Sequence, residues 1–166
     1  FQLGYKHKLF LSTTGRNDWV STLPDGNRSF FYPSVSASYV FTEDLLKNSN
    51  LFTFGKIRMS WAQVGKGPRF GKIGHHFIPE GNFPFNGVGG YRASTAAGDM
   101  NIQPEKDNSF EIGTNLHFLR NRVRLDYAYY VTDVTNQIFT VGTAYSSGLS
   151  GITRNAGEYK TWGQEL

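Results

Sequence analysis

The sequence contains no cysteine, which excludes a disulfide framework and any chemistry that depends on a thiolate. It also has no run of about 18 apolar residues, the length that a membrane-spanning helix needs. The mean hydropathy of -0.41 is typical of a soluble protein. That value does not exclude a membrane β-barrel, because every second side chain of a barrel strand faces a polar interior.

Charged residues are also scarce, at 18% of the chain, compared with about 25% in soluble domains. The net charge of +4 and the pI near 9.3 would suit a partner such as nucleic acid. The basic residues are scattered along the chain, however, and Lys6, Arg58 and Arg124 are examples. A nucleic-acid-binding protein gathers its basic residues on one face, so we expect no nucleic-acid partner.

Aromatic residues are abundant, at 16%, and many take part in a two-residue alternation of apolar and polar side chains over Asn108–Val131. Side chains alternate between the two faces of a strand, so this alternation predicts a hairpin with one apolar and one polar face. The turn is expected at Arg120-Asn121. A slip of one residue would mix the faces, so the pattern also predicts the register. The expected pairs include Leu116 with Leu125 and Asn115 with Asp126.

The same alternation recurs along the chain, and no segment shows a sustained helical period. The sequence therefore predicts an all-β fold of about six antiparallel strands. The expected strands are Gln2–Thr14, Ser29–Thr42, Thr53–Val64, the two strands of the hairpin, of which the second continues toward Phe139, and a last strand from about Arg154.

The connections between these strands are alternately long and short. The longest is the Gly- and Pro-rich segment Gly65–Asp107, which is improbable as a loop inside a small soluble domain. Long outer loops and short periplasmic turns are typical of bacterial outer-membrane barrels. We therefore predict that the chain is a segment of an antiparallel transmembrane β-barrel.

About six strands cannot close such a barrel, because the smallest bacterial examples have eight. An open sheet with an apolar face would also aggregate through its edges. The chain has neither an initiator methionine nor a signal peptide, and both ends lie in strand-like sequence. We therefore expect residues 1–166 to be a piece of a larger polypeptide.

Seven residues on the polar side of the predicted strands are expected to face the barrel lumen. A charge on the lipid side would cost about 2–4 kcal/mol at the centre of the bilayer. The expected lumen-facing residues are Lys56, Arg58, Glu111, Asn115, His117, Arg124 and Asp126.

The long connections contain exposed aromatic residues with two open interpretations. Aromatic rings stack on sugars, and aromatic residues with arginine are common at protein interfaces, which favours contact with a substrate or a lid. The alternative is that these side chains pack the loops against one another. The candidate loop residues are Trp19, Phe77, Phe83, Phe85, Tyr91 and Arg92.

Short motifs that suggest catalytic or metal sites lack their partners. His75-His76 point apart in an extended chain, and with Glu80 they have no further ligand at the usual spacing. The run Gly87–Gly90 lacks the Lys-Ser/Thr of a phosphate loop, and Ser147–Gly151 is not a nucleophile elbow. Asp25-Gly26-Asn27 begins like a calcium loop but does not continue as one. We therefore expect no enzyme and no bound metal or cofactor.

Six sequence blocks together resemble, in order and spacing, the C-terminal part of the barrel of SusC/RagA-type TonB-dependent outer-membrane transporters. The resemblance covers nearly the whole chain, and it is weakest in the long Gly65–Asp107 connection. The blocks are RNDW at Arg16–Trp19, NRSFFYPSVSASYVF at Asn27–Phe41, FGKIRMSWAQVG at Phe54–Gly65, MNIQPEKDNSFEIG at Met100–Gly113, FLRNRVRLDYAYY at Phe118–Tyr130 and NAGEYKTWGQEL at Asn155–Leu166.

This resemblance implies a 22-stranded barrel in the outer membrane of a Bacteroidota bacterium. Residues 1–166 would be its C-terminal portion, without the plug domain, the TonB box or the signal peptide. The expected partners are a SusD-like surface lipoprotein that acts as a lid, TonB through the missing N-terminal part, and outer-membrane lipid and lipopolysaccharide. The implied function is TonB-dependent uptake of glycans or peptides.

Two alternatives remain open from the sequence. A SusC-like barrel could act as a structural or accessory subunit of another outer-membrane complex, without energised transport. The chain could also be a soluble β-sandwich binding module, in which case four side chains would face a protein core, namely Phe110, Ile112, Leu125 and Tyr127.

Overall fold

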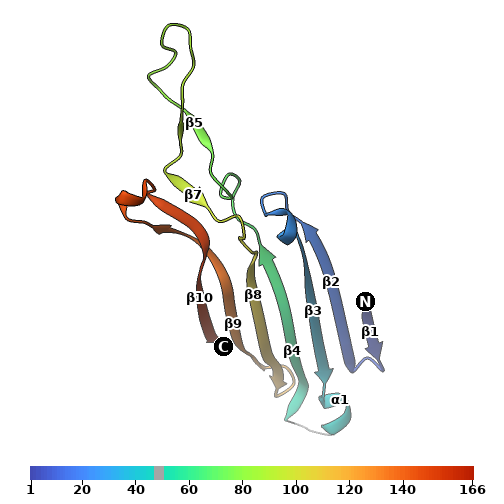
Figure 1. The fold of residues 1–166 in the computed structure, drawn as a ribbon. Helices are drawn as coiled ribbons and strands as arrows, with labels where there is room; N and C mark the ends of the chain where they lie inside the picture. Colours follow the sequence, from blue (N-terminus) through green and yellow to red (C-terminus); the bar gives the residue numbers. More distant parts are fainter. Residues whose placement is uncertain (47–50) are drawn as a thin grey trace.

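The chain folds into one broad sheet from which a narrow hairpin projects (Figure 1). The computed structural model describes residues 1–46 and 51–166. Eight strands form the sheet in the order β1-β2-β3-β4-β8-β9-β10-β7, and β5 and β6 form the separate hairpin. The strands are β1 (Gln2–Tyr5), β2 (Leu9–Trp19), β3 (Ser29–Val40), β4 (Phe52–Lys66), β5 (Phe77–Pro79), β6 (Tyr91–Ala93), β7 (Ala96–Gly98), β8 (Glu105–Phe118), β9 (Val123–Gly142) and β10 (Gly151–Glu165).

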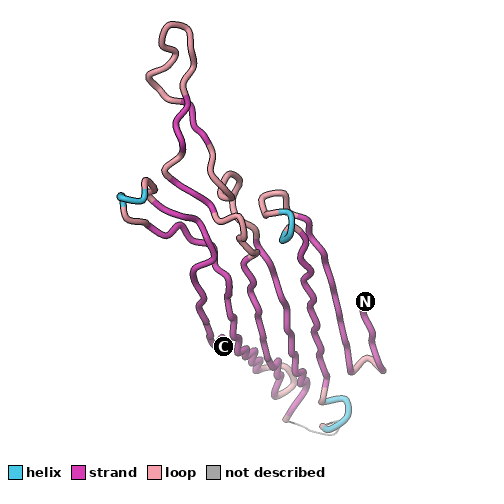
Figure 2. Tube along the Cα trace, in the orientation of Figure 1, coloured by secondary structure: helices cyan, strands magenta, loops and turns pink. Residues whose placement is uncertain are grey.

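Helical structure is limited to short pieces in the connections (Figure 2). These are α1 (Thr42–Leu45) and the 3₁₀ turns Asp25–Asn27 and Tyr145–Ser147. None of the helices in the described residues is long and apolar enough to cross a membrane. Neighbouring long strands all pair antiparallel, which confirms the predicted all-β, antiparallel fold class.

The β8–β9 hairpin has the predicted register. Leu116 lies opposite Leu125, and Asn115 lies opposite Asp126. The Arg122 amide donates to the Leu119 carbonyl at 3.3 Å, which closes the turn around Arg120 and Asn121. These two central residues have φ angles of 56° and 66°. Two positive φ angles are typical of the type I′ turn, whose twist matches that of the flanking strands.

The register separates the side chains into two faces across the whole sheet. We call one the apolar face, defined by the row Leu11, Ala37, Met59, Ile112 and Tyr129, which lie opposite one another on five neighbouring strands. The other is the polar face, defined by the adjacent row Ser12, Ser36, Ser60, Glu111 and Tyr130. The predicted segregation of apolar from polar side chains therefore extends from β2 to β9.

The apolar face carries no second sheet in the described part of the chain. Phe110, Ile112 and Leu125 remain 37%, 37% and 36% exposed. A β-sandwich would bury these side chains between two sheets. The β-sandwich alternative is therefore not supported by the fold.

The single first strand predicted over Gln2–Thr14 is wrong, because two strands and a turn occupy this segment. Tyr5 lies opposite Leu9, and the Lys8 amide donates to the Tyr5 carbonyl at 3.0 Å. Lys6 and His7 have φ angles of 49° and 57°, again typical of a type I′ turn. Asn-Gly is the usual signal for this turn, and Lys-His carries none. Moreover, Tyr5 and Leu9 are an even number of positions apart. The alternation of the two faces in the sequence therefore continues through the turn and does not reveal it.

The long connection after β4 contains more structure than the predicted loop Gly65–Asp107. It forms the β5–β6 hairpin and then returns along the loop end of the sheet through β7. We call residues 94–104, which contain β7, the belt. β7 pairs parallel with the start of β10, the Ser150 amide donates to the Thr95 carbonyl at 2.8 Å, and the Asp99 amide donates to the Thr153 carbonyl at 2.9 Å.

Asn155 fastens the belt to the sheet. Its Oδ1 accepts a hydrogen bond from the Gln103 amide at 2.7 Å, and its Nδ2 donates to the Gln103 carbonyl at 2.9 Å. The same Nδ2 donates to the Asn136 carbonyl at 2.6 Å, where the pairing of β9 with β10 is irregular. Asn136 has a φ of 57°, a conformation that asparagine tolerates better than most residues.

The largest fully buried side chains in the described residues lie at this loop end rather than on either face of the sheet. Leu23, in the β2–β3 connection, and Ile102, in the belt, are fully buried. Asn27 Nδ2 donates to the Ile102 carbonyl at 3.0 Å, which ties the two connections together. The large apolar side chains on the apolar face, such as Met59 at 46% and Trp162 at 66%, remain exposed. The described residues therefore do not cover the apolar face.

We expect Asn155→Ala to loosen the belt while the sheet stays intact. Three hydrogen bonds are lost and two of their partners lie on Gln103, so local stability should fall by about 1–3 kcal/mol. Hydrogen exchange of residues 94–104 in the intact protein should accelerate, with no change in β8. Asn82→Ala, in the projecting hairpin, is the matched control. Unchanged exchange at Gln103 would contradict this role for Asn155.

Candidate functional site

A cluster of charged and amide side chains lies on the polar face at the centre of the sheet. Lys56 and Arg58 come from β4, Glu111 and Asn115 from β8, and Asp126 from β9. The register places Lys56 opposite Asn115, which in turn lies opposite Asp126. We call these five residues the ion cluster. They are five of the seven residues predicted to face the lumen.

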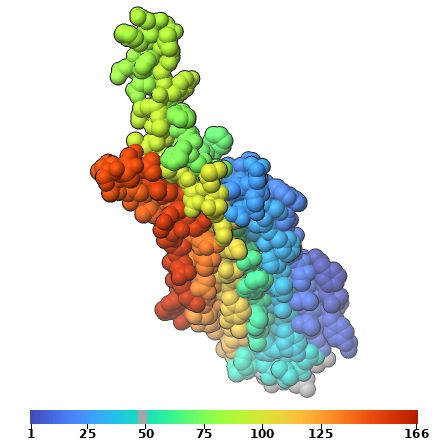
Figure 3. All heavy atoms as spheres, in the orientation of Figure 1, coloured from blue at the N-terminus to red at the C-terminus, as the bar shows by residue number. Residues whose placement is uncertain are grey.

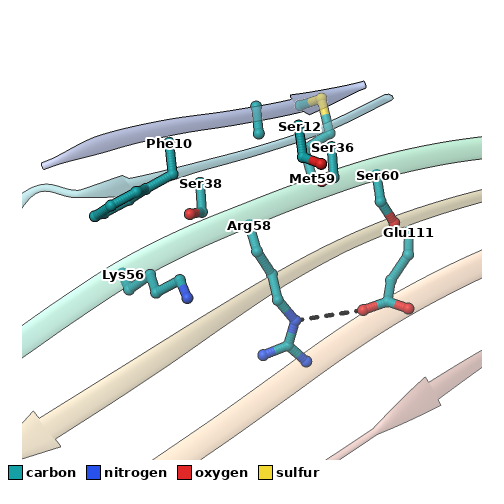
Figure 4. A pocket seen from close by; sticks show the side chains of 10 residues that line it. Phe10, Ser12, Ser36, Ser38, Lys56, Arg58, Met59, Ser60 and Glu111 are labelled. Atoms are coloured by element: carbon teal, nitrogen blue, oxygen red, sulfur yellow. Dashed lines mark hydrogen bonds and ion pairs between the residues drawn. The ribbon is translucent and has the colours of Figure 1, made fainter. Parts of the chain in front are cut away.

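Arg58 is the centre of the ion cluster because it contacts two carboxylates on different strands. Its Nε lies 3.3 Å from Glu111 Oε1, and its Nη1 lies 2.9 Å from Asp126 Oδ1 (Figure 4 shows the first contact). Asn115 Nδ2 donates to Asp126 Oδ2 at 2.9 Å, which holds that carboxylate from the other side. Arginine suits this role because its planar guanidinium presents five donors in a fixed geometry.

Two groups of the ion cluster, the Lys56 ammonium and Asn115 Oδ1, can form polar contacts that are not made within the described residues. Among those residues, the Lys56 ammonium forms no ion pair, although it lies beside the cavities described below. Asn115 Oδ1 is buried without a hydrogen-bond partner in the described part of the chain. Buried polar groups normally have partners, so these two atoms are suited to contact polar groups from outside the sheet.

A cavity of about 260 Å³ lies beside the ion cluster on the same face. Four serine side chains line it, and Figure 4 shows them with Arg58, Glu111 and the Phe10 ring. Hydroxyl groups donate and accept hydrogen bonds, so this surface can bind water or polar chain segments. The serines are Ser12, Ser36, Ser38 and Ser60, from β2, β3 and β4.

His117 and Arg124, the other two residues predicted to face the lumen, lie next to the ion cluster but outside its hydrogen bonds. They lie opposite each other on β8 and β9. His117 Nδ1 lies 3.0 Å from Asn121 Oδ1, and its ring lies 5.0 Å from that of Phe54. A second cavity of about 260 Å³ is lined by Phe54, His117 and three members of the ion cluster.

A second charged group, which was not predicted from the sequence, lies on the polar face near the end of β2. Arg16 Nη2 lies 2.9 Å from Asp18 Oδ2, and Tyr32 Oη donates to the same oxygen at 2.9 Å. The Arg16 guanidinium also lies 5.1 Å from the centre of the Tyr32 ring. The first strand was predicted to end at Thr14, so Arg16 and Asp18 were assigned to a loop. The RNDW block was the signal that could have revealed them.

The candidate loop residues are distributed over two separate places. Trp19 lies at the end of β2, opposite Ser29, and not in a loop as predicted; its side chain is 75% exposed. The others belong to the β5–β6 hairpin, residues 77–93, which we call the arm. The arm projects away from the sheet (Figure 3). Its members are Phe77, Phe83, Phe85, Tyr91 and Arg92.

Side chains of the arm are mostly exposed. Phe77, Phe85 and Tyr91 are 72%, 70% and 72% exposed. Phe83 is less exposed because its ring lies against Gly90, where an added Cβ atom would come within 2.4 Å of it. Arg92 Nε pairs with Glu80 Oε2 at 3.0 Å, and the tip between Gly81 and Gly90 carries no charged residue. The tip of the arm is therefore an uncharged projection with exposed aromatic side chains.

The apolar residues of the apolar face end abruptly toward the loop end of the sheet. The row Trp61, Phe110, Val131 and Trp162 is followed by the row Gln63, Asn108, Asp133 and Lys160. Gln63 Nε2 donates to Asn108 Oδ1 at 2.9 Å, and Lys160 Nζ lies 3.2 Å from Asp133 Oδ1. The apolar positions of β8 run from Phe110 to Phe118, a length of about 26 Å along the strand at about 3.3 Å per residue. That length suits the apolar band of an outer-membrane barrel, about 25 Å tall.

In residues 1–46 and 51–166, no group of three His, Cys, Asp or Glu side chains could hold a metal ion. His75 and His76 lie in the exposed approach to the arm. The geometry of the polar face supports hydrogen bonding and ion pairing with another polar surface.

Comparison with known proteins gives the same fold. The family model described as TonB dependent receptor-like, beta-barrel matches residues 1–166. TonB-dependent receptors P26 and P3 of Formosa agariphila are 25% and 26% identical to the chain over 166 and 168 residues. Each alignment covers 98% of this chain but only 17% and 16% of the relative. The chain therefore spans about a sixth of the length of these curated relatives.

Solved structures with the same fold include two of the RagAB peptide importer or transporter. The "closed-closed" importer matches with a TM-score of 0.85 at 24% identity, and the transporter with 0.87 at 22% identity. Both matches cover 98% of this chain and 18% of the other chain. The siderophore receptor PirA from Pseudomonas aeruginosa is more distant, with a TM-score of 0.64 at 18% identity. At these identities the structural matches show the fold alone.

We expect the contact of Arg58 with Asp126 to contribute modestly to stability. The two side chains are 36% and 52% exposed, and solvated pairs of this kind contribute about 0.2–1 kcal/mol. A double-mutant cycle with Arg58→Gln and Asp126→Asn, read as thermal unfolding of the intact protein, should give a coupling in this range. The pair Lys160→Gln and Asp133→Asn is the matched control on the other face. A coupling of zero would contradict the ion cluster.

Proposed function

Since the chain belongs to the TonB dependent receptor-like β-barrel family, we propose that it forms part of the barrel wall of an outer-membrane importer of the SusC/RagA type. The apolar face contacts lipid, and the polar face contacts the lumen. The observation that carries this proposal is the separation of apolar from polar rows across the five strands from β2 to β9. Residues 1–166 are then the C-terminal portion of the barrel, and further parts of the polypeptide complete it.

The cost of placing charges in lipid favours this orientation of the two faces. All seven candidate lumen residues lie on the polar face, where water and polar protein groups can solvate them. Placing one charged side chain in lipid at the centre of the bilayer would cost about 2–4 kcal/mol. The charged pair on the apolar face, Lys160 with Asp133, lies beyond the aromatic row, at the level of the polar headgroups.

The connections orient the wall in the membrane. The short turns at Lys6-His7 and Arg120-Asn121 lie at one end of the sheet, and the belt and the arm lie at the other (Figure 1). Barrels of this class have short periplasmic turns and long extracellular loops. We therefore place the arm outside the cell, in the outer membrane of a Bacteroidota bacterium, with lipid and lipopolysaccharide around the apolar face.

The polar face suits contact with a plug domain. The Lys56 ammonium, the buried Asn115 Oδ1 and the serine-lined cavity offer donors and acceptors that the sheet itself does not use. In the proposed importer, a plug elsewhere in the polypeptide fills the lumen and carries the TonB box. TonB then supplies the energy for transport.

The substrates that we propose are glycans or peptides, delivered under the lid of a SusD-like surface lipoprotein. The resemblance to the RagAB peptide importer supports an imported peptide. The uncharged, exposed aromatic side chains of the arm support a contact with protein, because aromatic anchors dominate many protein interfaces. Trp19, at the rim of β2, is available to the substrate or to the lid.

The proposal predicts that cells expressing the intact protein take up its substrate only when TonB is present. Uptake of labelled oligopeptides and oligosaccharides should fall to background in a TonB-deficient strain, with the barrel still in the outer membrane. Uptake that persists without TonB would overturn energised import. A barrel with neither a TonB box nor a plug would instead support the accessory role in another outer-membrane complex.

A second prediction concerns the arm. Changing Phe77, Phe85 and Tyr91 together to serine should reduce copurification of the lipoprotein with the tagged barrel by about tenfold or more, since interface aromatics are frequent hot spots. Phe70→Ser is the matched control, because Phe70 is 92% exposed but lies outside the arm. The amount of barrel in the outer membrane should not change. Undiminished copurification would assign the lid contact to other loops.

A further inference from the structure

The apolar face is not smooth, because a groove of about 510 Å³ lies near the short-turn end of the sheet. This volume is within the range of about 300–1,000 Å³ usual for small-ligand sites. The groove runs across β4, β8 and β9, and its walls are almost entirely apolar. The walls include Phe41, Phe52, Ile57, Ile112, Leu116 and Tyr127.

The small residues Gly113 and Thr114 lie among the large side chains that line the groove, and the Phe41 ring forms one of its walls. Thr114 lies between Ile57 and Tyr127, and Gly55 lies next to Leu116. The Phe41 ring covers Gly55, where an added Cβ atom would come within 2.2 Å of the ring. Paired strands hold the floor in place, so the depression is a fixed feature of the wall.

The end of the sheet below the groove has an excess of positive charge. The β8–β9 turn begins three residues after Leu116, and its exposed Arg120 and Arg122 follow the groove directly. The Leu119 amide donates to the Leu51 carbonyl at 3.0 Å, which holds this turn against the start of β4. The described residues of the three connections at this end carry Lys6, Lys8, Arg120 and Arg122 against Glu43 and Asp44.

The two carboxylates do not neutralise the arginines. Asp44 pairs with Lys8 and accepts a hydrogen bond from Tyr39 Oη at 2.9 Å. Glu43 lies in α1, next to β3, on the side of the groove away from the β8–β9 turn. Arg124, the next cation along the chain, lies on the polar face opposite His117.

We propose that the groove together with Arg120 and Arg122 binds one phospholipid with an anionic headgroup. An acyl chain lies in the groove, and the phosphate lies against the two guanidinium groups. The proposal rests on the membrane placement proposed above, which puts this end in the periplasmic leaflet. An apolar groove matches a hydrocarbon chain, and arginine binds phosphate through charge-assisted hydrogen bonds.

The test uses the intact protein in nanodiscs that contain phosphatidylglycerol or phosphatidylcholine with a photoactivatable diazirine on an acyl chain. After illumination, labelled peptides are quantified by mass spectrometry. Labelling of Ile112–Leu116 should exceed that around Leu11 and Met59 on the same face. The labelling should also be several-fold stronger with phosphatidylglycerol than with phosphatidylcholine. Each basic residue near a membrane surface strengthens binding to anionic lipid by about 1 kcal/mol, which is about fivefold in the binding constant.

Two pairs of variants separate the parts of the site. Thr114→Phe fills the groove and should remove the excess labelling, whereas Thr13→Phe makes the same change on the same face outside the groove and should not. Arg120→Gln with Arg122→Gln should remove the preference for phosphatidylglycerol and leave acyl labelling in the groove. Arg124→Gln, on the polar face, is the matched control and should keep that preference.

The outcomes distinguish this proposal from the membrane placement on which it rests. Even labelling of the whole apolar face, with no preference for either lipid, would overturn the lipid site and leave the barrel wall in place. A preference that survives the loss of both turn arginines would overturn the headgroup contact. Absence of labelling anywhere on the apolar face would overturn the membrane placement itself.

Discussion

The ladder of backbone hydrogen bonds between neighbouring strands is the constraint on which the rest of this structure depends. In hydrocarbon, every peptide N–H and C=O group needs a partner within the protein, because water cannot supply one. β2, β3, β4, β8 and β9 each have neighbours on both sides. β1 lies at one edge, and β10 lies at the other beyond its short pairing with β7. The closed barrel of the family supplies the strands that these edges need.

The ladder also decides which side chains meet, because it fixes the register. Arg58 contacts carboxylates on both β8 and β9 only because β4 and β9 flank β8 in register. On the opposite face the same rows place Thr114 between the larger Ile57 and Tyr127 in the groove. A shift of one residue in β8 would turn Glu111 to the apolar face and Ile112 to the polar face. The positions of the charged and of the apolar side chains are therefore two consequences of one pairing.

The loop end follows different physics, because its contacts are local packing and side-chain hydrogen bonds. The belt is held by the pairing of β7 with β10, by Asn155 and by the hydrogen bond from Asn27 to the Ile102 carbonyl, so the base of the arm is tied to the sheet. Beyond this base the arm has the reciprocal hydrogen bonds of Phe85 with Val88 around an Asn86-Gly87 turn. A projection that is ordered before binding loses less conformational entropy when a partner docks on it.

Much of the wall could be predicted from the sequence, but the turn at Lys6-His7, the parallel β7 and the Arg16–Asp18–Tyr32 group could not. The turn has none of the usual Asn-Gly signal, and its flanking residues keep the strand parity. β7 is only three residues long and pairs with residues more than 50 positions away, so no local pattern reveals it. Arg16 and Asp18 were hidden by a strand that is longer than predicted.

The sequence by itself determined the two faces of the strands and the register of the β8–β9 hairpin, including the opposition of Leu116 and Leu125. These features depend on a two-residue period and a tight turn, which are local properties of the chain. Only the tertiary structure decided that Arg58 reaches Asp126, 68 residues away, and that Asn155 holds Gln103, 52 residues away. Such contacts depend on which strands become neighbours and on how a long connection returns across them, and neither is encoded in any single segment.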